Sequence, residues 1–157
     1  MKSLPKVFKN VKGFTLIELL VVIGILAILL SIVLIAINPA RQFGQANNTR
    51  RRSDVTQILN AIGAYAADNK GVLPAGILLN TAPGSKDISK ADIDICAALV
   101  TNYIPALPQD PTTATGTSVT DCTTAYVTGY TVTKDAAGRV TVSAPSAENG
   151  EVISNTR

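Results

Sequence analysis

The sequence predicts an α+β protein in which one long N-terminal helix packs on a small antiparallel sheet. Three observations support this prediction. Residues 14–37 form an apolar run, residues 55–66 repeat apolar side chains at helical spacing, and residues 126–143 are rich in Thr, Val and Tyr in period-two alternation. The first pattern is typical of a transmembrane helix, the second of an amphipathic helix and the third of strands with one buried face.

The apolar run is long enough to cross a membrane. Its 24 residues would extend about 36 Å as a helix, against roughly 30 Å of hydrocarbon. It is too long for the ~7–15-residue core of a secretory signal. Glu18 is its one ionisable side chain. A carboxylate in such a segment costs about 2.5–3.5 kcal/mol, so a plain anchor would not carry it and we expect it to have a partner.

A specific motif surrounds this acid. Residues 12–22 read KGFTLIELLVV, after a leader with four lysines. This window resembles the N-terminus of type IV pilins and of the pseudopilins of type II secretion systems. In that family a prepilin peptidase cuts after the glycine and methylates the new N-terminal residue. The resemblance implies cleavage between Gly13 and Phe14, methylation of Phe14, an assembly role for Glu18 and a pilin-like lollipop fold.

The same resemblance implies a structural role and no enzymatic one. The chain would be the precursor of a filament subunit that forms a homo-oligomeric helical filament. Its partners would be the prepilin peptidase, an assembly ATPase and an inner-membrane platform. It would cross the cytoplasmic (inner) membrane once before assembly and lie in an extracellular or periplasmic filament afterwards. A surface pilus (fimbrium) and the major pseudopilin of a secretion system both remain open. The rival classes are a membrane-tethered binding module that does not polymerise and an anchored enzyme.

Cleavage would create a charged amine four residues before Glu18. That amine could pair with the acid inside one helix, or with the acid of a neighbouring copy staggered along a common axis. Either pairing is worth more in a low-dielectric setting than in water. Gly24, Ala27 and Ser31 lie roughly opposite Glu18 on a helix. Such a small-residue stripe favours close head-to-tail contacts, although small residues are also frequent in membrane helices generally.

The helix is expected to kink or break after residue 37, because Pro39 removes a hydrogen bond and disfavours helix at Asn38. It then resumes as far as Gly71, which is placed to adopt a left-handed conformation. We divide the chain into a leader (residues 1–13, removed), a transmembrane or filament-core helix (14–37), its amphipathic continuation (38–71) and a C-terminal globular region with a loop and antiparallel strands (72–157).

Within the globular region we expect strand segments at residues 126–127, 129–133 and 139–143. The last two are joined by a hairpin loop over residues 134–138, with Gly138 at a positive-φ position. A short helix is predicted around residues 93–101. The segment 103–111 contains three prolines and reads as an extended connector.

Cys96 and Cys122 lie downstream of the membrane segment. If that part is exported, a disulfide worth about 2–4 kcal/mol is favoured over two free thiols. No metal or cofactor is expected, because the chain has no histidine and no second cysteine pair. Four acids could supply oxygens to calcium, but their spacing fits no EF-hand and scattered loop acids are the favoured interpretation: Asp92, Asp94, Asp110 and Asp121.

Charge gives little support for nucleic-acid binding. Without the four leader lysines, ten basic and eleven acidic side chains remain, a net charge of −1. The triplet Arg50, Arg51 and Arg52 would spread over about 200° of a helix. We therefore expect these arginines to contact solvent, lipid headgroups or neighbouring subunits, and we do not predict a nucleic-acid partner.

Overall fold

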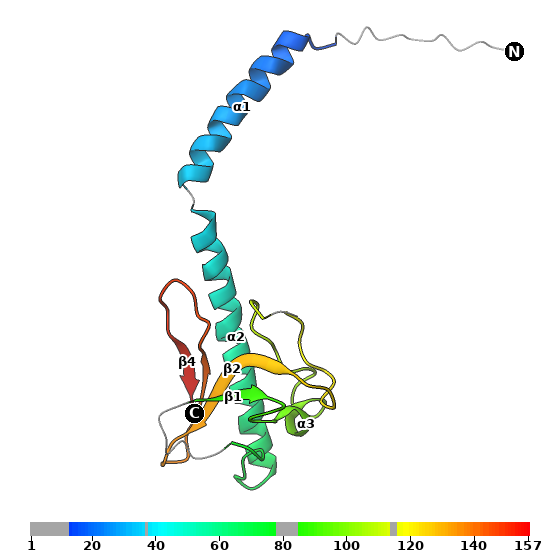
Figure 1. Cartoon of the computed structure of the whole chain (residues 1–157), viewed down its shortest axis with the longest axis vertical. Coiled ribbons are helices and arrows are strands. Elements are labelled where there is room, and N and C mark those ends of the chain that lie inside the picture. The colour runs from blue at the N-terminus through cyan, green and yellow to red at the C-terminus, as the bar shows by residue number, and fades with distance from the viewer. Residues whose placement is uncertain (1–12, 37, 78–84, 114–115) are drawn as a thin grey trace, which may run out of the picture. The chain divides into compact units, whose positions relative to one another are not determined.

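The computed structural model describes residues 13–36, 38–77, 85–113 and 116–157. The elements, in chain order, are α1 (Leu16–Ala36), α2 (Pro39–Asp68), β1 (Lys86–Ser89), α3 (Cys96–Leu99), β2 (Val127–Lys134), β3 (Val140–Ala144) and β4 (Ile153–Thr156) (Figure 1). The chain divides into an N-terminal unit, Met1–Pro39, and a C-terminal unit, Ala40–Arg157.

The N-terminal unit contains α1, which has the length and composition of a membrane span. Its 21 residues have a mean hydropathy of 3.3, and none of them is buried. The predicted apolar helix is therefore confirmed, with its first turn at residue 16.

The predicted break in the helix is confirmed as well. α1 ends at Ala36 and α2 begins at Pro39. Asn38 has a φ of +22°, which no helix can continue through. Proline suits the first position of α2 because the amide there has no helical acceptor. The chain thus has two helices in place of one continuous helix.

In the C-terminal unit, α2 buries one face against the sheet. Val55, Ile58, Leu59 and Ile62 are all at most 4% exposed, as their helical spacing predicts. α2 ends at Asp68, three residues earlier than expected, and Gly71 takes a φ of +86° while its N–H donates to the carbonyl of Ala66 at 2.7 Å.

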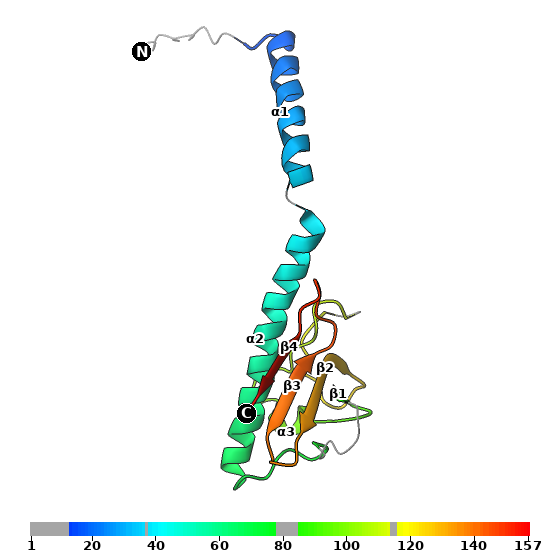
Figure 2. The same cartoon turned by 90° about the vertical axis from the view of Figure 1, so that its left-hand side faces the viewer.

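The sheet is fully antiparallel, with strand order β1-β2-β3-β4 (Figure 2). β2 and β3 form the predicted hairpin, in which Val132 faces Val142 and Gly138 has a φ of +88°. β1 and β4 were not predicted, and α3 is shorter than the helix expected at 93–101. The buried apolar core combines α2, the sheet and the 93–107 segment, and includes Ile88, Ile95, Leu99, Leu107, Tyr130, Val132, Val142 and Ile153.

Candidate functional site

The first turn of α1 is closed by a reciprocal pair of side chains. The backbone N–H and the hydroxyl of Thr15 both donate to Oε2 of Glu18, each at 2.7 Å. In return, the N–H of Glu18 donates to Oγ1 of Thr15 at 3.3 Å. This is a capping box, which satisfies amides that a helix start otherwise leaves without partners. We call this pair the capping box below.

The capping box places the predicted cleavage site just outside the helix. Gly13 and Phe14 precede α1, and Phe14 is 82% exposed. An added Cβ at Gly13 would meet no atom within 4 Å. Phe14 and Glu18 also line one shallow groove on α1, together with Ile17, Leu19, Val21 and Val22. Gly13, Phe14 and Glu18 thus lie in one short stretch, and the predicted scissile bond is in non-helical chain.

Thr15 was not among the site residues predicted from the sequence. Its signal was present, because Ser or Thr followed three residues later by Glu before an apolar run is the signature of a capping box. The other hydroxyl in the described part of this helix, Ser31, donates to the carbonyl of Ala27 at 2.8 Å. Ser31 therefore exposes little polarity on the small-residue face.

The arginine triplet corrects one of our predictions. Each of the three side chains pairs with an acid of the same chain. Arg50 lies 3.8 Å from Asp54, Arg51 contacts Asp110 and Glu148, and Arg52 contacts Glu151. The predicted contact with solvent, lipid or neighbouring subunits is wrong for Arg51, which is fully buried.

Arg51 joins α2 to two loops. Its Nε donates to Asp110 Oδ2 at 2.7 Å. Its Nη1 donates to Asn48 Oδ1 at 2.9 Å and to Glu148 Oε2 at 2.8 Å. Its Nη2 donates to Asp110 Oδ1 at 3.0 Å and to Thr112 Oγ1 at 3.2 Å. We call these five residues the Arg51 cluster. It uses all the donors of the guanidinium. Gly129 of β2 allows the strand to lie close to Asp110, since a Cβ at position 129 would be only 2.9 Å from Cβ of Asp110.

The hydrogen bonds and charges of the Arg51 cluster shift the pKa values of its two acids. Burial alone would raise the pKa of Asp110, but hydrogen bonds from Arg51 and Thr112 outweigh it and the pKa is lowered. Hydrogen bonds from Arg51 and Asn47 also lower the pKa of Glu148. Asp54 behaves differently: burial raises its pKa, although the hydroxyl of Tyr130 donates to it at 2.7 Å.

A disulfide joins Cys96 and Cys122, whose Cα atoms are 5.4 Å apart. Three of the four acids considered for calcium have hydrogen-bond partners within the chain. Asp94 accepts from Lys90 and Tyr126, Asp110 belongs to the Arg51 cluster, and Asp121 accepts from Thr123. No group of three or more possible metal ligands occurs within the residues that the structure describes.

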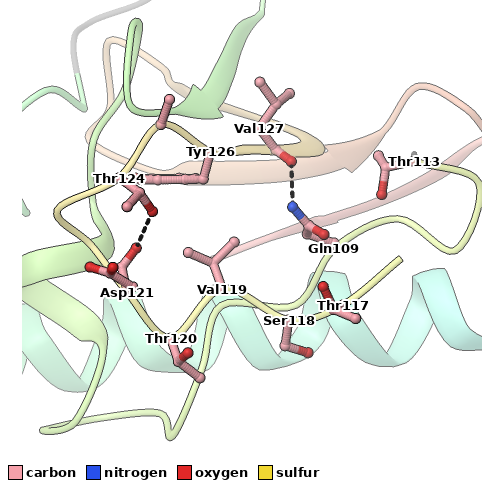
Figure 3. Close-up of a pocket in the computed structure, with 11 residues that line it drawn as sticks. Gln109, Thr113, Thr117, Ser118, Val119, Thr120, Asp121, Thr124, Tyr126 and Val127 are labelled. Atoms are coloured by element: carbon pink, nitrogen blue, oxygen red, sulfur yellow. Dashed lines mark hydrogen bonds between the residues drawn. The ribbon is translucent and has the colours of Figure 1, made fainter. Parts of the chain in front are cut away.

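A pocket of about 510 Å³ lies beside the start of β2. Figure 3 shows the side chains that line it. Its lining is rich in hydroxyl groups. Gln109 donates to the carbonyl of Val127 at 2.9 Å, and the hydroxyl of Thr124 donates to the carbonyl of Asp121 at 3.4 Å. The lining therefore offers several hydrogen-bond donors and acceptors. Its residues are Gln109, Thr113, Thr117, Ser118, Val119, Thr120, Asp121, Thr124, Ala125, Tyr126 and Val127.

Comparison with known families gives one result. Residues 8–34 match the model of the prokaryotic N-terminal methylation motif, which covers the lysine-containing end of the leader, the Gly13–Phe14 bond and most of α1. The chain is therefore a prepilin-like protein. This prepilin-type motif places it in the type IV pilin and pseudopilin superfamily, whose members are generally non-enzymatic structural subunits. Searches of curated proteins and of solved structures found no match.

Proposed function

We propose that this chain is the precursor of a structural subunit of a type IV pilus or pilus-like filament, cleaved between Gly13 and Phe14 and polymerised through its N-terminal helix. The observation that carries the proposal is the methylation motif on a helix that is apolar on every side, unburied and marked by a single acid. The membrane would hold this helix before assembly, and other copies of the helix would hold it afterwards.

Electrostatics supplies the assembly step in this proposal. The amine of a cleaved Phe14 and the carboxylate of Glu18 are the opposite charges closest to the apolar part of α1. In a low-dielectric core an unpaired carboxylate is penalised and an ion pair is strengthened. Pairing would therefore fix the offset between successive copies of the helix. The prepilin peptidase, an assembly ATPase and an inner-membrane platform are the partners that the family implies.

Two other roles are distinguished by where the protein is found. The major pseudopilin of a type II secretion system would form short periplasmic fibres, whereas a pilin would form long surface fibres. A membrane-tethered binding module, for which the hydroxyl-rich pocket is the observation in favour, would stay in membranes as a monomer. Electron microscopy and fractionation of sheared surface material separate the three.

The processing step is tested at the N-terminus of the native protein. Intact mass and N-terminal peptide mass spectrometry should find a chain that begins with methylated Phe14. Gly13→Ala, which adds a side chain beside the scissile bond, should lower the cleaved fraction. Assembled protein that still begins with Met1 would contradict the proposal.

The assembly role of Glu18 is tested by substitution. Glu18→Ala should leave the chain cleaved and membrane-inserted but lower its yield in sheared filaments at least tenfold, because the terminal amine loses its partner. Ser31→Ala is the matched control, since it removes a polar group from the same helix without changing charge. Filaments of normal yield from Glu18→Ala would refute the role given to this acid.

A further inference from the structure

We propose that Asn149 is a site of spontaneous covalent modification, in which the backbone nitrogen of Gly150 attacks the Asn149 side chain and the amide becomes aspartate or isoaspartate. These two residues form the one Asn-Gly pair in the sequence. Both residues are exposed, so water reaches them. The proposal goes beyond filament assembly and does not depend on it.

The two residues lie at the centre of a tight turn. Asn149 has a φ of +58° and Gly150 a φ of +73°, and the N–H of Glu151 donates to the carbonyl of Glu148 at 3.2 Å. Positive φ at both central residues is the pattern of a type I′ turn, which favours Asn-Gly. We call residues 148–151 the Asn149 turn.

The attacking nitrogen of Gly150 is not engaged elsewhere. Within the part of the chain that the structure describes, the N–H of Gly150 donates to no acceptor. Glycine also places no side chain beside this nitrogen and leaves the backbone free to rotate. Both features favour attack on the neighbouring side chain.

The reaction balances with water as its one co-reactant. A bond forms between the Gly150 nitrogen and Cγ of Asn149, and the bond from Cγ to Nδ2 breaks. The proton of the Gly150 N–H leaves with the amide nitrogen as ammonia. Water then opens the five-membered imide. Cleavage on the Cγ side gives aspartate, and cleavage on the backbone side gives isoaspartate, which has one extra methylene in the main chain.

A contact with α2 restrains the Asn149 amide. Nδ2 donates to the carbonyl of Arg41 at 3.3 Å, and a Cβ added at Gly44 would lie 2.7 Å from Nδ2. The amide must leave this position before the ring closes, because closure turns Cγ toward the Gly150 nitrogen. One long hydrogen bond is a weak restraint, so this opening is local and does not require global unfolding.

Modification would weaken the hold of the Asn149 turn on α2. A carboxylate at position 149 cannot donate to the Arg41 carbonyl, so that hydrogen bond is lost. The preceding residue, Glu148, binds the Asn48 side chain through its N–H at 2.9 Å and its carbonyl at 2.8 Å, and its carboxylate accepts from Arg51. A methylene inserted next to Glu148 would displace these contacts. In a filament that persists, old subunits would therefore differ from new ones.

The site is tested by peptide mass spectrometry of the full chain in detergent micelles. The protein is incubated in mildly alkaline buffer and digested in acid, which prevents modification during handling. Asn149 should be converted about tenfold faster than Asn60 and Asn155, because the residues that follow those two carry side chains. Both are exposed, and they serve as internal controls. Electron-transfer fragmentation should find isoaspartate at position 149.

Two glycine substitutions in α2 test the restraint. Gly44→Ala would displace the Asn149 amide and should raise its conversion rate about threefold. Gly63→Ala is the matched control, since it makes the same change on the same helix but its Cβ would approach Arg157, at 3.2 Å. It should leave the conversion rate of Asn149 unchanged.

The outcomes are separate from those of the assembly experiments. Selective conversion of Asn149 with isoaspartate present, accelerated by Gly44→Ala alone, supports the proposal. Conversion no faster than that of Asn155, or aspartate without isoaspartate, would overturn it. Equal rates in Gly44→Ala, Gly63→Ala and wild type would overturn the restraint by α2.

Discussion

Arg51 differs from the two arginines beside it although all three side chains are the same. Arg50 and Arg52 have side chains that are 47% and 57% exposed, while that of Arg51 is completely buried against Asp110. Position on the helix makes the difference, since Arg51 pairs with an acid in each of two loops, Asp110 and Glu148, and is covered by them. The central arginine is therefore part of the folded core, and its neighbours form surface ion pairs of little energetic weight.

Substitution by methionine tests this difference. Arg51→Met should lower the free energy of unfolding by about 3–5 kcal/mol, because Asp110 would remain buried without its cation. Arg52→Met, the same change one residue later, should cost at most about 1 kcal/mol. Urea unfolding followed by circular dichroism gives both values. Equal losses from the two variants would contradict the distinction.

Wild type and Arg51→Met should also differ in how their free energy of unfolding depends on pH. Arg51 lowers the pKa of both Asp110 and Glu148 in the folded state. Acids with lowered pKa values contribute stability above their ordinary values, roughly 4, and lose it as the pH falls through the lowered values. The stability difference between wild type and Arg51→Met should therefore be constant near neutral pH and shrink below about pH 4. A difference that persists unchanged to pH 2 would show that the charge pairs do not cause it.

Among the helices and strands, the sequence predicted the features that depend on residues close together in the chain. The break at Pro39, the positive φ of Gly138 and the β2–β3 hairpin each follow from residues that adjoin in sequence. β1 and β4 escaped prediction because each has four residues and no clear alternation of buried and exposed side chains. Their place in the sheet depends on pairing with distant strands, which propensity does not encode.

The residues of the candidate site also differ in whether the sequence alone could identify them. Gly13, Phe14 and Glu18 lie within six residues, so a short motif was enough to select them. Thr15 could have been found as well, since its partner is three residues away. The Arg51 cluster could not, because the partners of Arg51 lie 59 and 97 positions along the chain. Only the packed fold brings those acids to the helix.

For the molecule as a whole, the buried residues indicate that the C-terminal unit folds by itself. Among the residues that the structure describes, the apolar core lies between Val55 and Ile153, and α1 contributes none of it. A fragment of residues 40–157 should therefore be a soluble monomer that unfolds cooperatively. Its Tm should lie within a few degrees of that of the C-terminal unit in the detergent-solubilised whole chain, as measured by circular dichroism. An aggregated or unfolded fragment would mean that residues 1–39 contribute to the core.

The exposed apolar surface of α1 determines where a subunit could leave a filament of this protein. Sixteen Leu, Ile and Val side chains of this helix are exposed, and hiding side chains of this kind from water is worth about 1.5–3 kcal/mol each. Release of one subunit into water would then cost about 25–50 kcal/mol, far beyond what thermal motion supplies. A fibre of this protein would shed subunits only where lipid receives them, so its free end in solution would be inert and all turnover would occur at the base.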